Sequence, residues 1–191
     1  MSGAPRWRFL GAFVLAGLAA DQATKFLAVE RLTTAFERAG AATLGAKLGA
    51  FFRLTHLEVL AREPYYVFRP WWRMNYVENP NAAFGLGAIL SPGPRHAVFL
   101  LVAAVAVAAI AWYYRRLRPE QWPMRLALAM VLTGTLGNLV DRVARRYVID
   151  FVEWYWWNRP DLRWPTFNVA DSLISVGVVL LLLLPGGKKK A

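Results

Sequence analysis

Four aspartates that stand in or beside strongly apolar segments are the most informative residues of this chain. They are Asp21, Asp141, Asp150 and Asp171. A carboxylate in such surroundings is energetically costly, so each of them calls for a structural or a chemical explanation. Two carboxyl groups that face each other in a site of low dielectric constant share a proton. One of them then removes a proton from water while the other donates a hydrogen bond to a carbonyl oxygen, which is the chemistry of aspartic peptide hydrolysis.

Structural explanations compete for two of these acids. Asp141 is followed directly by Arg142, and an adjacent pair of this kind commonly orients the end of a helix. Asp21 and Lys25 stand four residues apart and therefore share one face of a helix, where they and Gln22 could form a polar lock. The residues alone leave both readings open beside the chemical one.

Asp150 and Asp171 have the fewest structural explanations. Asp150 lies between Ile149 and Phe151, an acid in an apolar triplet without an adjacent base. Asp171 stands near the start of an apolar helix, where it competes with Asn168 for the role of helix cap. These two acids are therefore the first candidates for chemistry.

Other hydrolytic sites fit the sequence less well. The chain has no cysteine, which excludes a cysteine nucleophile, disulfides and thiolate metal sites. Its two histidines, His56 and His96, make a histidine-rich metal site unexpected, and we expect neither a metal nor another cofactor. A dyad of Ser172 and Lys25 is conceivable, whereas a Ser-His-Asp triad would have to recruit a histidine from outside the helices.

The apolar segments that position these acids indicate a membrane protein. Of the 191 residues, 57% are hydrophobic and 18% are charged, whereas soluble domains have about 25% charged residues. Lysine and arginine gather at the ends of the apolar segments, as membrane anchors do, which argues against nucleic-acid binding. Since a membrane helix needs about 20 mostly apolar residues, we expect transmembrane helices at about 9–29, 97–114, 126–141 and 169–185.

The first apolar segment also fits a cleavable signal peptide. Arg6 and Arg8 precede the apolar run 9–18, and small residues follow it. Cleavage would leave three helices and place the two chain ends on opposite sides of the membrane. The distribution of Lys and Arg orients the bundle only weakly, although the short basic segment 115–125 favours both termini in the cytoplasm.

The segment of about 30–95 is expected to form a small element outside the membrane. An amphipathic helix is predicted over 33–52, and short strands are predicted at 65–68 and 74–77. The segment 142–168 is expected to be a second loop on the same side. Its aromatic cluster is typical of the headgroup level of a bilayer. The members of this cluster are Trp154, Tyr155, Trp156, Trp157 and Trp164.

The fold expected from these elements is an all-α membrane protein with four transmembrane helices and a small β/helical element outside the membrane. No repeat or low-complexity linker divides the chain, so residues 1–191 are expected to form one domain. Gly134 and Gly137 lie in the third apolar segment, where small residues permit close packing against another helix.

Four short blocks resemble the lipoprotein signal peptidase (signal peptidase II) family, the aspartic peptidases that remove signal peptides from bacterial prolipoproteins. The blocks are DQATK at 21–25, NPNAAF at 79–84, GTLGNLVDR at 134–142 with YVIDF at 147–151, and FNVADS at 167–172. They occur in the family's order. The resemblance implies a retained first helix, both termini in the cytoplasm, and an active site near the periplasmic face of the inner membrane, with the segment 30–95 as a periplasmic insertion.

The resemblance also implies roles for individual residues. Asp150 and Asp171 match the family's catalytic pair. Further residues would hold this pair and the substrate backbone, namely Asp21, Lys25, Asn79, Asn138, Asp141, Arg142, Asn168 and Ala170. The implied substrate is a prolipoprotein whose transmembrane signal peptide is cut immediately before a diacylglyceryl-modified cysteine. On the same grounds, we expect the protein to be surrounded by membrane lipid, to bind globomycin-type inhibitors and to be a monomer.

The chain departs from the family pattern at several points. The family has glycine where this chain has Asn81 and usually where it has Arg146, so the backbone turns there are expected to differ. Residues of about 37–72 lack a counterpart. An interfacial helix or a lid over the substrate groove is the expectation for them.

The rival class is a non-enzymatic membrane protein, either a proton-coupled carrier or an assembly scaffold. In such a protein the buried acids would bind ions or partners. Four short helices without inverted repeats give little room for alternating access, which argues against a carrier.

Overall fold

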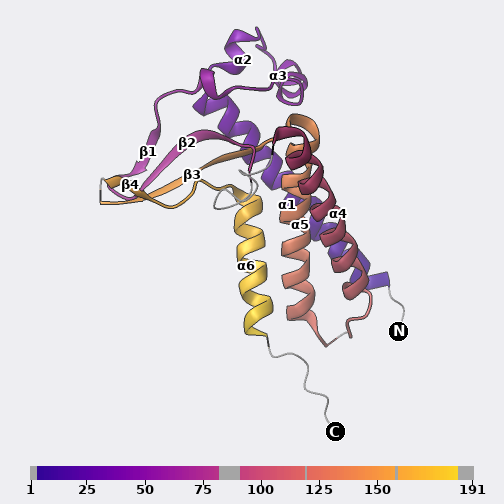
Figure 1. Ribbon diagram of the computed structural model, residues 1–191. Helices are drawn as coiled ribbons and strands as arrows, with labels where there is room; N and C mark the ends of the chain where they lie inside the picture. The colour runs from indigo at the N-terminus through magenta and orange to yellow at the C-terminus, as the bar shows by residue number, and fades with distance from the viewer. Residues whose placement is uncertain (1–3, 82–90, 119, 158, 185–191) are drawn as a thin grey trace.

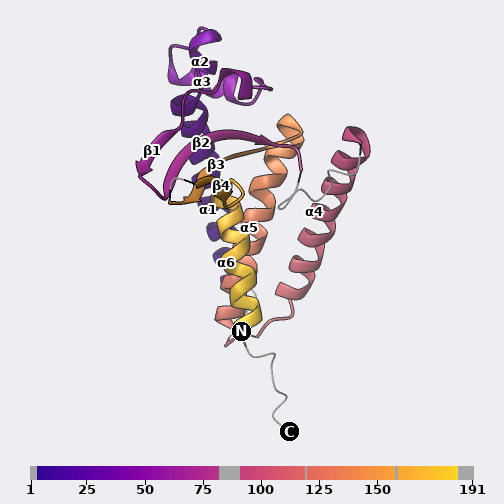
Figure 2. The ribbon, with the colours of Figure 1, turned by 60° about the vertical axis from the view of Figure 1, so that its left-hand side comes forward.

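The computed structural model describes residues 4–81, 91–118, 120–157 and 159–184, and long helices running side by side form the body of this part (Figures 1 and 2). These helices are α1 (Ala4–Leu32), α4 (Pro92–Tyr114), α5 (Trp122–Arg145) and α6 (Val169–Leu183). Helices are therefore confirmed in all four predicted segments. Within the described residues, α1, α4 and α5 are long and apolar enough to cross a membrane. The 15 residues of α6 extend about 22 Å, which is shorter than a full span.

The two ends of the bundle differ in what they carry. At one end α1 begins, α6 ends, and a short turn joins α4 to α5 (Figure 1). Arg115, Arg116 and Arg118 lie at this turn. The smaller helices and the sheet lie at the other end (Figure 2). The bundle is therefore asymmetric, with one end, named the basic end after these arginines, and another end that carries the sheet and the smaller helices.

Small residues let α6 approach α5 closely. A Cβ atom at Gly177 would lie 2.8 Å from the carbonyl oxygen of Ala127, and one at Gly134 would lie 2.7 Å from the side chain of Ile174. Neither position accommodates a larger residue without moving the helices apart. The predicted packing role of Gly134 is confirmed.

An antiparallel sheet, four-stranded in the described part of the chain, lies across the end of the bundle in the order β1-β2-β3-β4. Its strands are β1 (Tyr65–Phe68), β2 (Trp72–Asn79), β3 (Val148–Trp156) and β4 (Arg159–Arg163). The predicted strand 65–68 is confirmed, and the strand predicted at 74–77 is longer. The prediction that 142–168 is a loop is wrong, because β3 pairs with β2, a strand about 75 positions earlier in the chain. The protein is thus mostly helical with a small antiparallel sheet, in agreement with the expected β/helical element.

The single helix predicted over 33–52 is also wrong. The segment forms α2 (Ala35–Arg38) and α3 (Leu44–Phe51), and η1 (Glu58–Leu60) follows. Gly40 separates α2 from α3 because it adopts a φ of +64°, the left-handed region that favours glycine. Thr43 then begins α3 as its N-cap and accepts a hydrogen bond from the Ala46 N–H at 3.2 Å.

Clusters of buried apolar side chains join the elements at both ends of the bundle. At the sheet end, Val29 of α1, Phe51 of α3 and Ile149 of β3 belong to one cluster. At the basic end, Leu10 of α1 and Tyr114 of α4 belong to another that also includes residues of α5. Burial of these side chains ties α1 both to the sheet and to the other helices.

Arg146 ends α5 in the left-handed conformation with a φ of +69°. The turn at this position is therefore of the kind that glycine adopts, and the exposed arginine carries its strain. We predict that Arg146→Gly raises the free energy of unfolding by about 1 kcal/mol, since relief of strain outweighs the added freedom of the unfolded chain. Thermal unfolding in detergent measures this change. Arg146→Ala keeps the Cβ atom, and an equal gain in that variant would contradict the explanation.

Candidate active site

The strand β3 aims Asp150 into a cleft with a volume of about 950 Å³. Alternate residues of a strand point to opposite faces, so Val148, Asp150 and Trp154 line the cleft while Ile149 belongs to the core. Asp150 pairs with Val77 of β2 and is only 1% exposed. A carboxyl group is thus held at the inner wall of an otherwise open cleft.

Asp171 reaches the same cleft from the first turn of α6. Its backbone N–H donates to Asn168 Oδ1 at 2.9 Å, and its Oδ2 accepts from the Asn168 N–H at 3.2 Å. This reciprocal arrangement is a capping box, which confirms Asn168 as the cap and gives Asp171 a structural role as well. The remaining oxygen, Oδ1, accepts from Asn138 Nδ2 at 2.8 Å.

Side-chain amides hold the carboxylate of Asp150. Asn168 Nδ2 donates to Oδ1 at 2.7 Å, and Asn79 Nδ2 donates to Oδ2 at 2.9 Å. Asn168 Nδ2 also lies 3.2 Å from Asn138 Oδ1. Since Asn168 contacts Asp150 through its side chain and caps Asp171, it fixes the two acids relative to each other.

Burial and the negative charge of Asp171 raise the pKa of Asp150 to about 8, against the opposing effect of the amide donors Asn79 and Asn168. Asp150 is therefore mainly protonated at neutral pH. A protonated carboxyl beside a second acid is the arrangement in which one group donates a hydrogen bond while the other accepts a proton.

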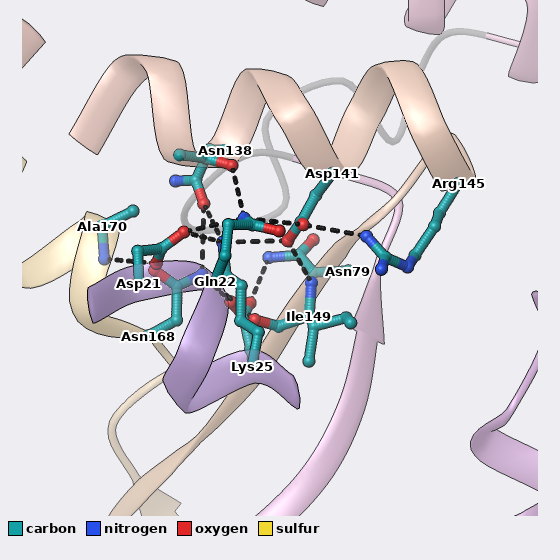
Figure 3. A network of polar contacts seen from close by, with 12 residues as sticks. Asp21, Gln22, Lys25, Asn79, Asn138, Asp141, Arg145, Ile149, Asn168 and Ala170 are labelled. Atoms are coloured by element: carbon teal, nitrogen blue, oxygen red, sulfur yellow. Dashed lines mark hydrogen bonds and ion pairs between the residues drawn. The ribbon is translucent and has the colours of Figure 1, made fainter. Parts of the chain in front are cut away.

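A network of buried charges lies behind the cleft (Figure 3). Lys25 Nζ lies 2.9 Å from Asp21 Oδ2, 2.9 Å from Asp141 Oδ2 and 3.2 Å from Asn138 Oδ1. Arg145 Nη1 donates to Asp141 Oδ1 at 3.1 Å. Lys25 and Arg145 thus balance Asp21 and Asp141, as burial of such charges requires. The predicted pair of Asp21 and Lys25 is confirmed.

The predicted pairing of Asp141 with Arg142 is wrong. Consecutive residues of a helix point about 100° apart, so Asp141 contacts Arg145, four positions on, rather than its neighbour. Arg142 instead lines the cleft, and its Nη2 donates to the carbonyl oxygen of Asn81 at 2.8 Å. Its guanidinium lies 4.4 Å from the ring centre of Phe99.

The network also fastens neighbouring elements to one another. Asp21 Oδ1 accepts from the backbone N–H of Ala170 at 3.1 Å, which fixes the start of α6 against α1. Asp141 Oδ2 accepts from the backbone N–H of Ile149 at 3.2 Å, which fixes β3 next to Asp150. The residues behind the cleft therefore position the two elements that carry Asp150 and Asp171.

The ten residues predicted for the site come together in two layers. Those that line the cleft are Asn79, Asn138, Arg142, Asp150 and Asp171. Those buried behind it are Asp21, Lys25, Asp141, Asn168 and Ala170. In the described part of the chain no hydrogen bond joins Ser172 to Lys25, and the Ser172 hydroxyl donates to the Asn168 carbonyl at 3.0 Å. No group of three or more His, Asp or Glu residues among the described ones could hold a metal ion.

Sequence reasoning missed Asn81 and Arg145 as members of the site, whereas Gln22 takes its place in the predicted polar lock with Asp21 and Lys25. Gln22 Nε2 donates to Asp21 at 3.1 Å and to Asp141 at 3.3 Å. The spacing of four residues between Asp141 and Arg145 is a signal that could have identified Arg145. Nothing local to Asn81 shows that its carbonyl oxygen binds an arginine 61 positions away.

Gly137 permits the approach of Asp21 to α5, because a Cβ atom there would lie 2.7 Å from Asp21 Oδ2. We predict that Gly137→Ala displaces this carboxylate and lowers the free energy of unfolding by about 2 kcal/mol, since buried hydrogen bonds are lost. Thermal unfolding in detergent measures the loss. Gly11→Ala is the matched control, because its Cβ atom would meet nothing within 4 Å. Equal effects of the two substitutions would contradict the prediction.

A family model described as signal peptidase (SPase) II matches residues 13–184. The chain is 59% identical over 186 residues to a lipoprotein signal peptidase of Anaeromyxobacter sp. (strain Fw109-5), covering 97% of this chain and 88% of that protein. It is 37% identical over 177 residues to a lipoprotein signal peptidase of Geobacter sulfurreducens, covering 93% and 91%.

A solved structure described as a bacterial membrane enzyme, obtained by the in meso method at 2.3 Å resolution, has a similar fold. The TM-score is 0.64 at 21% sequence identity, and the likeness covers 96% of this chain and 93% of that one. At this identity the likeness extends to the fold alone.

Proposed function

Because the chain belongs to the signal peptidase II family, we propose that Asp150 and Asp171 are the catalytic pair with which it removes signal peptides from prolipoproteins. The observation that carries this proposal is the convergence of the two acids on one cleft. Each is held by amide donors, and Asn168 contacts both. The pair thus has the preorganisation that catalysis by positioned acids needs.

The proposed mechanism divides the work between the two acids. Asp150, protonated at neutral pH, donates a hydrogen bond to the carbonyl oxygen of the peptide bond. Asp171, at the N-terminus of α6 where negative charge is favoured, removes a proton from the attacking water. A tetrahedral intermediate forms, and the proton passes from Asp171 to the amine that leaves.

The walls of the cleft suit a lipidated substrate. Trp154 and Trp164 border it on the sheet side, and Ile174 and Val176 border it on α6. These apolar side chains provide contact area for acyl chains and for an apolar signal peptide. We therefore assign as substrate a transmembrane signal peptide followed by a diacylglyceryl-modified cysteine, with cleavage immediately before that cysteine. Globomycin-type inhibitors are expected to occupy the same cleft. Residues 1–191 are expected to act as one domain, and a single copy of the chain is expected to suffice for cleavage.

The proposed orientation places the basic end of the bundle in the cytoplasm. Arg115, Arg116 and Arg118 follow the positive-inside rule there, and the Arg116 guanidinium lies 3.8 Å from the ring centre of Trp112 in the manner of an interfacial anchor. The cleft and the sheet then face the periplasm, at the outer surface of the inner membrane. In this proposal α6 is the fourth transmembrane helix. A carrier or scaffold role is not favoured, since the family is one of peptidases.

Substitution of either proposed catalytic acid tests the assignment. We predict that Asp150→Asn and Asp171→Asn each lower the cleavage rate by about 10³-fold or more while the protein stays folded in membranes. Cleavage of a diacylglyceryl-modified peptide by purified protein, without added metal or nucleotide, measures the rate. Ser172→Ala, which changes a side chain of the same cleft, is expected to retain cleavage. Full activity of either folded aspartate variant would refute the proposal.

The protonation of Asp150 predicts the alkaline limb of the pH–rate profile. As the pH rises through about 8, Asp150 loses its proton and can no longer donate to the carbonyl, so the rate falls. The hydrogen bond from Asn79 lowers the pKa of Asp150, and its removal in Asn79→Ala is expected to move the limb to higher pH. Initial rates from about pH 5 to about pH 10 measure the position of the alkaline limb in the native chain and in Asn79→Ala. Since the pKa of Asp150 is about 8, a rate of the native chain that keeps rising beyond about pH 9 would contradict the role of a protonated Asp150.

A further inference from the structure

The segment 33–62, which carries α2, α3 and η1, stands apart from the cleft. None of its described residues is among those that line the cleft. Its two ends lie side by side, because Thr33 pairs with Ala61 and the Arg62 N–H donates to the Leu32 carbonyl at 2.8 Å. The segment is therefore a closed excursion from the end of α1, and its connection to the reaction must run through other residues.

Arg145 provides such a connection, because it contacts the segment 33–62 directly. Its Nη2 donates to the carbonyl oxygen of Phe51 at 2.6 Å. Phe51 is the last residue of α3, so this carbonyl lacks a partner within the helix. The guanidinium also lies 4.2 Å from the ring centre of Phe51 and 5.5 Å from that of Phe52. Arg145 is 3% exposed, so these contacts are made away from water.

The same guanidinium reaches the network behind the cleft. Its Nη1 donates to Asp141 Oδ1 at 3.1 Å, and the other oxygen of Asp141 accepts from the Ile149 N–H at 3.2 Å. Ile149 immediately precedes Asp150 on β3. An unbroken series of hydrogen bonds therefore leads from the end of α3 to the backbone next to a proposed catalytic acid.

We propose that Arg145 is a positioning residue through which the segment 33–62 braces Asp141, and through it Asp150, in the geometry that cleavage requires. This proposal rests on the proposed catalytic role of Asp150. Asp141 is held between Lys25 on one side and Arg145 on the other. Without Arg145, Asp141 Oδ1 is left with the longer contact of Gln22 Nε2 at 3.3 Å, and the attraction of Lys25 draws the carboxylate away from the Ile149 N–H. A small displacement of a catalytic group lowers the rate of the chemical step far more than it weakens substrate binding.

The distinguishing test separates the chemical step from substrate binding. Single-turnover cleavage of a diacylglyceryl-modified peptide by excess enzyme gives the rate constant, and multiple-turnover kinetics give KM. For Arg145→Met we expect a rate constant about 10- to 100-fold lower and a KM within about twofold of the native value, because the walls of the cleft are untouched. Arg53→Met is the matched control. Its exposed guanidinium donates to the Gly49 carbonyl at 2.9 Å within the same segment, and native kinetics are expected.

A second variant keeps the proposal testable where Arg145→Met fails to fold. Arg145→Lys retains the buried positive charge, but a single ammonium cannot bridge Asp141 and the Phe51 carbonyl as a planar guanidinium does. We expect near-native thermal stability and a single-turnover rate about tenfold lower. A native rate in either folded variant, whatever the change in stability, overturns the proposal. If Asp150→Asn also cleaves normally, the proposed function itself fails, and that result is independent of Arg145.

Discussion

The ammonium group of Lys25, buried between two carboxylates, is the interaction on which the rest of the site depends. An uncompensated charge would not remain in this place, because its transfer from water costs several kcal/mol. Asp21 and Asp141 compensate it at 2.9 Å each, and their other oxygens bind the backbone of α6 and the side chain of Arg145. One cation thereby determines how α1, α5 and α6 meet.

From this centre the two proposed catalytic acids are positioned by different kinds of structure. Asp150 depends on a strand, whose alternation turns it toward the cleft while its neighbours enter the core. Asp171 depends on the first turn of a helix, where the capping box with Asn168 fixes its backbone. Asn168 is common to both, which explains why acids 21 positions apart in the chain converge. A strand and a helix end are both rigid, so neither acid relies on a flexible loop.

The parts of this arrangement that depend on local spacing could be predicted from the sequence. Apolar length identified all four helices, and the i, i+4 spacing identified the pair of Asp21 and Lys25. The strand β3 could not be identified because its partner lies about 75 positions away, and its dense aromatic residues resemble a membrane interface as much as a sheet. The prediction that Asp141 pairs with Arg142 failed for a different reason. Neighbouring residues of a helix do not share a face, so Asp141 pairs with Arg145 instead. The contribution of Asn81 depends on tertiary contacts alone.

Each of the two helices that contribute charged side chains to the network around Lys25 carries its own neutral pair. In α1 the pair is Asp21 with Lys25, and in α5 it is Asp141 with Arg145. Either helix can therefore enter the lipid as it is synthesised with the charges of this pair already neutralised, before its neighbours arrive. Assembly then needs only a rearrangement, in which Lys25 gains Asp141 as a second partner. Polar residues that join the helices around the site in the finished protein thus present a reduced obstacle to its biogenesis.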